Sequence, residues 1–201
     1  MLYFMEYEPT GKMEDRKTEH MLGRKLLAYG LKEEYGEDYK VEKTEGGKPY
    51  LLGASDIYFN ISHTKGMVVC AVSEREIGVD VEYVREAKES LIRRICSKEE
   101  REYIWGKEDM LKKVELEEDE TENVGLNDID LRFTRIWTLK ESYVKAIGKG
   151  LAFSMKEISF SLKEGEKGMI IGSSIEGWKY HQFMLRGKYV LSVCEENEWK
   201  K

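Results

Sequence analysis

Residues 77–84 read IGVDVEYV, an apolar stretch interrupted by two carboxylates. On a β-strand successive side chains point to opposite faces, so Gly78, Asp80 and Glu82 share one face while Ile77 and the valines share the other. Neighbouring carboxylates repel each other, and burying them without a positive partner is costly. The stretch therefore predicts a strand with a cation held beside Asp80 and Glu82.

The chain around this strand alternates helical and strand-like patterns. Apolar residues recur with helical spacing over about 14–35, and Gly36 follows the last of them. Residues 56–84 predict three short strands separated by turns. Ser97 and Glu100 have the spacing of a capping box, which predicts the start of a new helix. These patterns indicate an α+β fold.

Two segments of the chain are weakly similar in sequence, and we call them the echo segments. The segments KGMVVCAVSE at 65–74 and RGKYVLSVCEE at 186–196 both run from a basic residue and a glycine into an apolar strand that ends in glutamate. Each follows a long predicted helix. We therefore expect two similar α/β halves in a pseudo-twofold arrangement, residues 1–76 and 77–201, with the active site at the seam between them.

A second unusual stretch, FTRIWTLKESYVKAIGKGL, covers residues 133–151. Helical spacing places Trp137, Glu141 and Lys145 on one face. The buried stripe is expected to contain Ile136, Leu139, Tyr143, Ala146 and Ile147. Taken alone, the face with Trp137, Glu141 and Lys145 needs no functional explanation, since an i,i+4 pair of glutamate and lysine is an ordinary surface feature.

Together, the strand and the helix offer three carboxylates, those of Asp80, Glu82 and Glu141, with Lys145 one helical turn further on. Mg²⁺ prefers octahedral oxygen coordination and is usually shared between carboxylates, water and substrate phosphates. A magnesium ion is thus the predicted positive partner of the strand carboxylates.

Composition excludes several classes of protein. The 201 residues carry a formal net charge of −6, which argues against a general nucleic-acid binder. Three widely spaced cysteines, Cys70, Cys96 and Cys194, favour reduced core thiols in a cytoplasmic protein. The sequence shows no apolar run of membrane-spanning length and no signal peptide, so no membrane association is expected. The acidic run at 112–123 reads as a solvated loop or helix end.

Five motifs resemble, in the same order, those of the 4′-phosphopantetheinyl transferases. They are GKPYL (47–51), FNISHT (59–64), GVDVE (78–82), CSKEE (96–100) and WTLKESYVKAIGKGL (137–151). The resemblance is to the larger, surfactin-synthetase-activating type, a monomer whose single chain contains two similar halves. It implies transfer of the phosphopantetheine arm of coenzyme A to a serine of an apo acyl or peptidyl carrier protein, with release of 3′,5′-ADP. It also implies dependence on Mg²⁺, for which Mn²⁺ can substitute.

The resemblance assigns roles to individual residues. Asp80, Glu82 and Glu141 would bind the metal, and Glu141 would also accept the proton of the carrier serine. Lys145 would stabilise charge on the pyrophosphate, and Lys140 would help to bind phosphate near the same helix.

Three further matches concern coenzyme A. Lys48 and the adjacent Ser62 and His63 correspond to positions that bind the adenine nucleotide and its 3′-phosphate. The family usually places an arginine at the start of the first long helix, where this chain has Glu19, with Arg24 and Lys25 a turn later. Which basic residue of that helix meets coenzyme A stays open.

The carrier protein is expected to present an acidic helix beside its serine, which calls for a local basic and apolar patch. Arg93 and Arg94, which follow the metal-binding strand, are candidates for this patch.

Two alternatives are open at this point. A magnesium-dependent phosphohydrolase would use the same carboxylates and would break down coenzyme A or a nucleotide without any protein acceptor. A non-catalytic module would bind coenzyme A or a carrier protein without turnover.

Overall fold

The computed structural model describes residues 1–106, 128–165 and 168–197. The fold is α+β, as predicted, and is built from two three-stranded antiparallel sheets and two small hairpins. The acidic run at 112–123 lies outside the described residues. Among the helices that the structure describes, none has the length and apolar character needed to cross a membrane.

The N-terminal half has a central sheet in the order β1-β5-β4, with a small β2-β3 hairpin at one end. Its elements are β1 (Leu2–Glu6), α1 (Lys12–Tyr35), β2 (Val41–Lys43), β3 (Pro49–Leu51), β4 (Tyr58–Thr64) and β5 (Met67–Ser73). The predicted helix is confirmed, and Gly36 ends it with a φ of 74°, a left-handed conformation that favours glycine.

The C-terminal half repeats this order of elements with a sheet β6-β10-β9 and a β7-β8 hairpin. Its elements are β6 (Ile77–Tyr83), α2 (Glu89–Ile95), α3 (Lys98–Trp105), α4 (Asp128–Ile147), the 3₁₀ turns η1 (Gly150–Ala152) and η2 (Met155–Glu157), β7 (Phe160–Gly165), β8 (Gly168–Ser173), β9 (Trp178–Leu185) and β10 (Tyr189–Glu196). The capping box is confirmed, because Ser97 and Glu100 exchange both expected hydrogen bonds at the start of α3.

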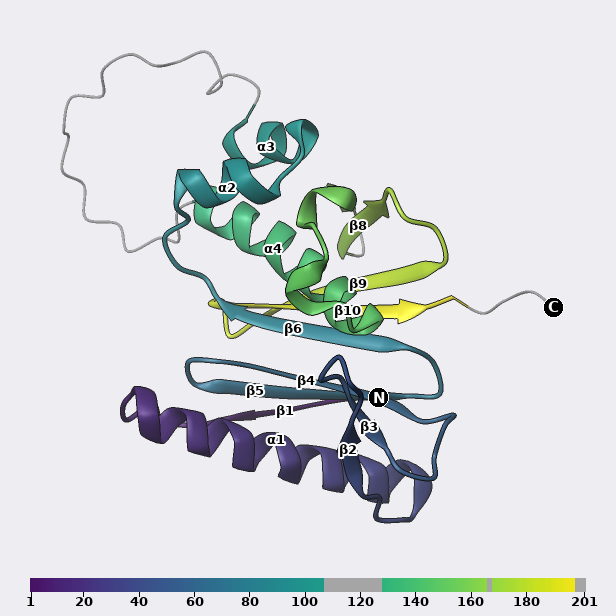
Figure 1. Cartoon of the computed structure of the whole chain (residues 1–201). Coiled ribbons are helices and arrows are strands. Elements are labelled where there is room, and N and C mark those ends of the chain that lie inside the picture. Colours follow the sequence, from purple (N-terminus) through teal and green to yellow (C-terminus); the bar gives the residue numbers. More distant parts are fainter. Residues whose placement is uncertain (107–127, 166–167, 198–201) are drawn as a thin grey trace.

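Layers stack from one side of the molecule to the other (Figure 1): α1, the β1-β5-β4 sheet, the β6-β10-β9 sheet, and α4 with α2 and α3 outside it. Between the sheets lies a core of apolar side chains from β5, β6 and β10, including Met67, Val79 and Leu191. The two echo segments form β5 and β10, the middle strands of the two sheets. The shared strand order agrees with two similar halves. A pseudo-twofold relation and a boundary between residues 76 and 77 remain predictions.

The two sheets meet along β4 and β6, which are joined by side chains instead of a backbone ladder. Asn60 Oδ1, Ser62 Oγ and Thr64 Oγ1 accept hydrogen bonds from the backbone N–H groups of Val79, Val81 and Tyr83 at 3.2, 3.2 and 3.3 Å. These short polar side chains satisfy the free edge of β6, since an unpaired buried N–H is costly.

Gly78 allows α4 to lie directly on β6. A Cβ atom at this position would lie 1.9 Å from the carbonyl oxygen of Ser142 and 2.5 Å from the backbone nitrogen of Ala146. The glycine in the GVDVE motif thus brings the helix backbone against the strand that carries Asp80 and Glu82.

Candidate active site at the seam between the halves

Lys145 of α4 joins the two halves at Asp80 of β6. Its Nζ donates hydrogen bonds to Asp80 Oδ1 at 2.5 Å and to Ser62 Oγ of β4 at 2.8 Å. Ser62 Oγ in turn donates to Asp80 Oδ1 at 3.0 Å. The residues come from three elements that meet only at the seam, so the structure brings together the strand motif and the helix motif (Figure 1).

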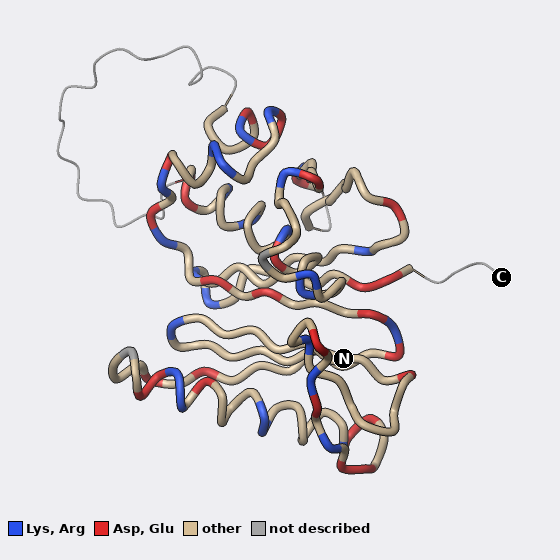
Figure 2. Tube along the Cα trace, viewed as in Figure 1, with Lys and Arg blue, Asp and Glu red and all other residues tan. Residues whose placement is uncertain are grey.

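The carboxylates at this seam carry more negative charge than Lys145 balances. Burial, together with the charges of Asp80 and Glu82 and against the opposing effect of Lys145, raises the pKa of Glu141 to about 6. Burial and the charge of Asp80 also raise the pKa of Glu82, which accepts a hydrogen bond from Thr64 Oγ1 at 3.2 Å. Figure 2 shows acidic positions along β6, with both signs of charge interspersed over the rest of the described chain.

A divalent cation fits this donor set. All three carboxylates offer hard oxygen ligands, and Asp80 Oδ2 is buried with no hydrogen-bond partner. Within the described ranges, however, no group of three or more His, Cys, Asp or Glu side chains is gathered at ligand distances. The chemistry of the residues suits Mg²⁺, while one oxygen of Asp80 is engaged by Lys145.

A cavity of about 660 Å³ opens beside these residues and is large enough for a cofactor-sized ligand. Its cationic groups are Lys48, Arg94 and Lys145, and Glu141 lies in its wall. The other lining residues are Gly46, Gly47, Pro49, Asn60, Ile61, Ile95, Trp137, Val144, Gly148, Gly150, Phe153, Ser154 and Met155. The cavity is therefore apolar over much of its wall and positive at several points.

Lys48, to which the resemblance assigns contact with coenzyme A, lines this cavity. Its Nζ donates to the carbonyl oxygen of Ala146 at 2.6 Å and forms an ion pair with Glu76. A Cβ atom at Gly148 would lie 2.8 Å from the Lys48 side chain, so glycine at this position lets the end of α4 pack against the Lys48 stem.

The position of Lys140 contradicts the prediction that it binds phosphate. Its side chain is fully buried, pairs with the equally buried Glu100 at 2.9 Å, and donates to the carbonyl oxygens of Met155 and Ile158. Glu100 also accepts a hydrogen bond from the backbone nitrogen of Phe160 at 2.9 Å. Lys140 therefore ties α4 to α3 and to the start of β7, and no phosphate can reach it.

Ser62 and His63 do not form one binding pair, because adjacent residues of β4 point to opposite faces. Ser62 is buried and its hydroxyl is used by Asp80, Lys145 and Val81. His63 points to α1, where its Nδ1 lies 3.0 Å from Glu19 Oε2. Ser62 thus positions the carboxylate and the lysine, and only His63 is left exposed to a ligand.

The two arginines of α2 have different surroundings. Arg94 lines the 660 Å³ cavity. Arg93 pairs with Glu89 at 2.6 Å and lies over the ring of Trp105, 5.0 Å from its centroid. Arg93 and Arg94 therefore do not form together the basic patch that was expected of them.

Sequence reasoning missed the partners that hold the site. Glu76 pairs with Lys48, Thr64 binds Glu82, and Glu100 neutralises Lys140. For Glu100 a signal existed, since a capping-box glutamate next to an apolar helix face is placed to be buried.

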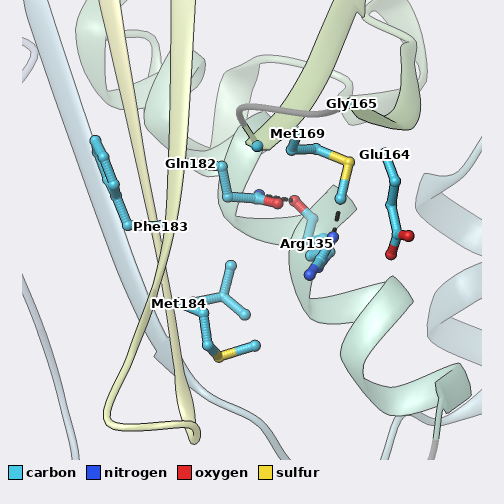
Figure 3. A pocket seen from close by; sticks show the side chains of 9 residues that line it. Arg135, Glu164, Gly165, Met169, Gln182, Phe183 and Met184 are labelled. Carbon is cyan, nitrogen blue, oxygen red and sulfur yellow. Dashed lines mark hydrogen bonds between the residues drawn. The ribbon is translucent and has the colours of Figure 1, made fainter.

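A second cavity, of about 330 Å³, lies apart from the carboxylates (Figure 3). Arg135 of α4, the β7-β8 hairpin and β9 surround it, and Gln182 Nε2 donates to the carbonyl oxygen of Arg135 at 3.0 Å. None of Asp80, Glu82, Glu141 and Lys145 lines it, so we do not assign the site to it.

Comparison with known proteins agrees with this geometry. The family model described as the 4′-phosphopantetheinyl transferase superfamily matches residues 76–194. The protein named 4′-phosphopantetheinyl transferase gsp, from Aneurinibacillus migulanus, is 36% identical over 115 residues, which are 57% of this chain and 40% of that protein. A 4′-phosphopantetheinyl transferase of Bacillus subtilis is 29% identical over 168 residues, 83% of this chain and 66% of that protein.

The matched part thus spans less than two thirds of the length of each of these two relatives. Among solved structures, the holo-[acyl-carrier-protein] synthase of Thermotoga maritima aligns with a TM-score of 0.42 and 18% identity, covering 62% of this chain and 64% of that one. The family match covers both the strand that carries Asp80 and the helix that carries Glu141. On that match, this chain belongs to the 4′-phosphopantetheinyl transferase superfamily.

Proposed function

We propose that the protein transfers the 4′-phosphopantetheine arm of coenzyme A to a serine of an apo carrier protein and releases 3′,5′-ADP. In this reaction the serine oxygen forms a bond to the β-phosphorus of coenzyme A, the bond to the bridging pyrophosphate oxygen breaks, and the serine proton passes to a base. The observation that carries the proposal is the contact of Lys145 with Asp80 at the wall of the 660 Å³ cavity.

Glu141 is the proposed base. A pKa raised to about 6 by burial leaves the carboxylate mostly ionised near neutral pH and makes it a better proton acceptor than an exposed glutamate. It lies in the cavity wall one helical turn from Lys145. A base and a cation on one helix face suit a displacement in which charge moves from the attacking to the leaving oxygen.

Coenzyme A is proposed to lie in the cavity. The apolar wall, with Trp137, Phe153 and Met155, suits the pantetheine arm, whereas Lys48, Arg94 and Lys145 suit the phosphates. Asp80, Glu82 and Glu141 would hold Mg²⁺, which supplies charge neutralisation on the pyrophosphate when bound. Lys145 would then move from Asp80 to a phosphate oxygen.

The carrier serine is proposed to approach from the other side of Trp137. A hollow of about 390 Å³ lies there, and Glu82, Arg85, Lys88, Leu91, Phe133 and Trp137 are among its lining residues. Trp137 borders both hollows, and each contains a carboxylate of the site. Arg85 and Lys88 could meet an acidic helix of the carrier, and Leu91 and Phe133 provide apolar contact.

The test is the reaction of purified protein with an apo carrier protein, coenzyme A and Mg²⁺, read by intact mass. We expect one phosphopantetheine on the carrier and an equal amount of 3′,5′-ADP. A carrier variant with the serine replaced by alanine is the matched control and should gain nothing. Loss of coenzyme A without gain of mass on the carrier would instead indicate a phosphohydrolase.

A further inference from the structure

A hydrogen-bonded group of polar side chains lies between α4 and the C-terminal sheet. It joins Thr138 of α4, Ser192 of β10 and Gln182 of β9, and we call it the Thr138 network. Thr138 Oγ1 and Ser192 Oγ are 2.8 Å apart, and both residues are fully buried. Gln182 Nε2 donates to Ser192 Oγ at 2.9 Å and to the carbonyl oxygen of Arg135 at 3.0 Å, a bond that Figure 3 shows. The network thus ties one turn of α4 to two strands.

The Thr138 network lies next to Asp80 on the sheet. Ser192 is directly opposite Asp80 in the β6-β10 ladder and directly opposite Gln182 in the β10-β9 ladder. Cross-strand partners point to the same face of a sheet, so these three side chains form one row. The row faces α4, since Asp80 and Gln182 both bond to residues of that helix. The network therefore continues the row of Asp80 across the sheet.

Glu141 lies between two attachments of α4 to this row. Thr138, about one turn before Glu141, contacts Ser192, and Lys145, about one turn after it, bonds to Asp80. The helix is thus held against the sheet on both sides of Glu141. Loss of the first attachment would leave the Glu141 backbone fixed from one side only.

Gln182 has an unpaired acceptor, which a residue that only stabilised the fold would not need. Its nitrogen must face the carbonyl oxygen of Arg135, because only the nitrogen can donate. Its Oε1 is then left buried without a hydrogen-bond partner among the described residues. Because a buried acceptor without a partner costs free energy, the net contribution of this amide to folding is small. Its hydrogen bonds nevertheless fix one orientation of α4 on the sheet.

We propose that Thr138 and Gln182 are positioning residues, which hold Glu141 at the place above β6 from which it accepts the proton of the carrier serine. Neither side chain contacts a substrate, and both act through the backbone of α4. The inference rests on the proposed function, because it requires Glu141 to be the base.

The test uses two nearly isosteric substitutions, Gln182→Met and Thr138→Val, each alone and both together. Ser142→Ala is the matched control, since Ser142 is also a buried hydroxyl residue of α4 but donates within its own helix, to the carbonyl oxygen of Leu139 at 2.8 Å. Transfer of phosphopantetheine is measured over a range of coenzyme A concentrations. Thermal unfolding of each protein is followed by circular dichroism.

We expect kcat to fall by roughly 10–10² in each single variant, because a shift of about 1 Å in a reacting group has effects of this size. The KM for coenzyme A should stay within about threefold of the wild-type value. The double variant should lose no more than the slower single variant, since the two residues act as a unit. Thr138→Ser keeps the hydroxyl and should restore kcat, and Ser142→Ala should leave it unchanged.

Stability should not follow turnover. Gln182→Met should unfold at the same temperature as the wild-type protein or at a higher one, because the substitution removes the unpaired acceptor. The carbonyl oxygen of Arg135 still accepts a hydrogen bond from Thr138 Oγ1 at 3.2 Å. A slower but equally stable enzyme is the result that distinguishes positioning from a structural role.

Wild-type kcat in both single variants would overturn the inference while leaving the proposed function intact. A loss of kcat that parallels a loss of thermal stability, or an equal loss in Ser142→Ala, would show a merely structural role and would also contradict the inference. Absence of transfer by the wild-type protein would overturn the proposed function itself.

Discussion

Two lysines of α4, Lys140 and Lys145, stand five residues apart in the same motif, and each pairs with a carboxylate. Lys140 and Glu100 are both fully buried, and further hydrogen bonds satisfy the ammonium group and the carboxylate. Lys145 is partly exposed at a cavity, and its partner Asp80 has one oxygen unpaired. The difference indicates that one pair holds the fold together, whereas the other is available for chemistry.

The largest effect should come from Glu141, the carboxylate beside the Lys145–Asp80 pair. Replacing Glu141 with Gln keeps its size but removes the proton acceptor, so turnover should fall by roughly 10²–10⁴, as is typical of a lost general base. Coenzyme A affinity should stay within about tenfold of the wild-type value. Steady-state rates and calorimetry over a Mg²⁺ series provide the measurement, and recovery of turnover at high Mg²⁺ would remove the role of base.

The next effect distinguishes the two lysines by how much each contributes to the free energy of unfolding. Lys140→Met leaves the buried Glu100 carboxylate without its cation and should lower the free energy of unfolding by about 3–5 kcal/mol. Lys145→Met should lower it by less than Lys140→Met does, because Lys145 is partly solvated and Asp80 keeps its hydrogen bond from Ser62. Urea unfolding followed by circular dichroism gives both values. Equal losses in the two variants would show that burial does not distinguish the pairs.

The burial of Lys140 could have been predicted from the sequence. Ile136, Lys140 and Tyr143 follow the helical spacing of the apolar stripe, so position 140 belongs to the buried face. The motif led us to expect a phosphate ligand there, and the packing of α3 decides otherwise. The strand that carries Asp80, the capping box at Ser97 and the long helices were all predictable, because their patterns are local.

The opposite directions of Ser62 and His63 also follow from strand alternation, but their partners do not. Glu19 and Lys145 lie far from β4 in the sequence, and only the packing of α1 and α4 against the strands places them there. The same holds for Lys48, whose contact with Ala146 joins residues 98 positions apart. Local patterns predict which face a residue occupies, whereas its partner depends on tertiary structure.

Reversing the charge of basic residues at the 390 Å³ hollow should weaken binding of the carrier protein. Arg85→Glu together with Lys88→Glu should raise the KM for an acidic carrier protein by roughly tenfold, at about 1 kcal/mol or less for each exposed charge. The value of kcat and the affinity for coenzyme A should stay close to the wild-type values. Equal changes at Lys163 and Lys179, away from the hollow, provide the control, and an unchanged KM would remove this surface from carrier binding.

The smallest effect concerns pH and metal. The pKa of Glu141 is raised from 4.5 to about 6, so the folded protein favours the protonated carboxyl. The stability that this group contributes is therefore present below about pH 4.5 and is lost as pH rises through 6. Without divalent cations, thermal unfolding should show a steeper loss of stability between about pH 4.5 and 6 in the wild-type protein than in Glu141→Gln.

Adding Mg²⁺ at pH 7 should raise the unfolding temperature of the wild-type protein, because the ion neutralises the carboxylates of the site. The rise should be smaller in Asp80→Asn, which itself should be at least as stable as the wild-type protein without metal. The same rise in both proteins would show that Asp80 does not bind the ion.

The contrast between the two lysines is tested most directly by phosphopantetheine transfer in Lys145→Met and in the double variant Lys140→Met/Glu100→Gln, at a temperature where both are folded. Removing both charges of the buried pair avoids an uncompensated carboxylate. We predict that Lys145→Met loses at least about 10² in transfer rate, whereas the double variant keeps a rate within about tenfold of the wild-type value. Full transfer by Lys145→Met, or a folded but inactive double variant, would contradict the assignment of the chemistry to Lys145 and of the fold to Lys140.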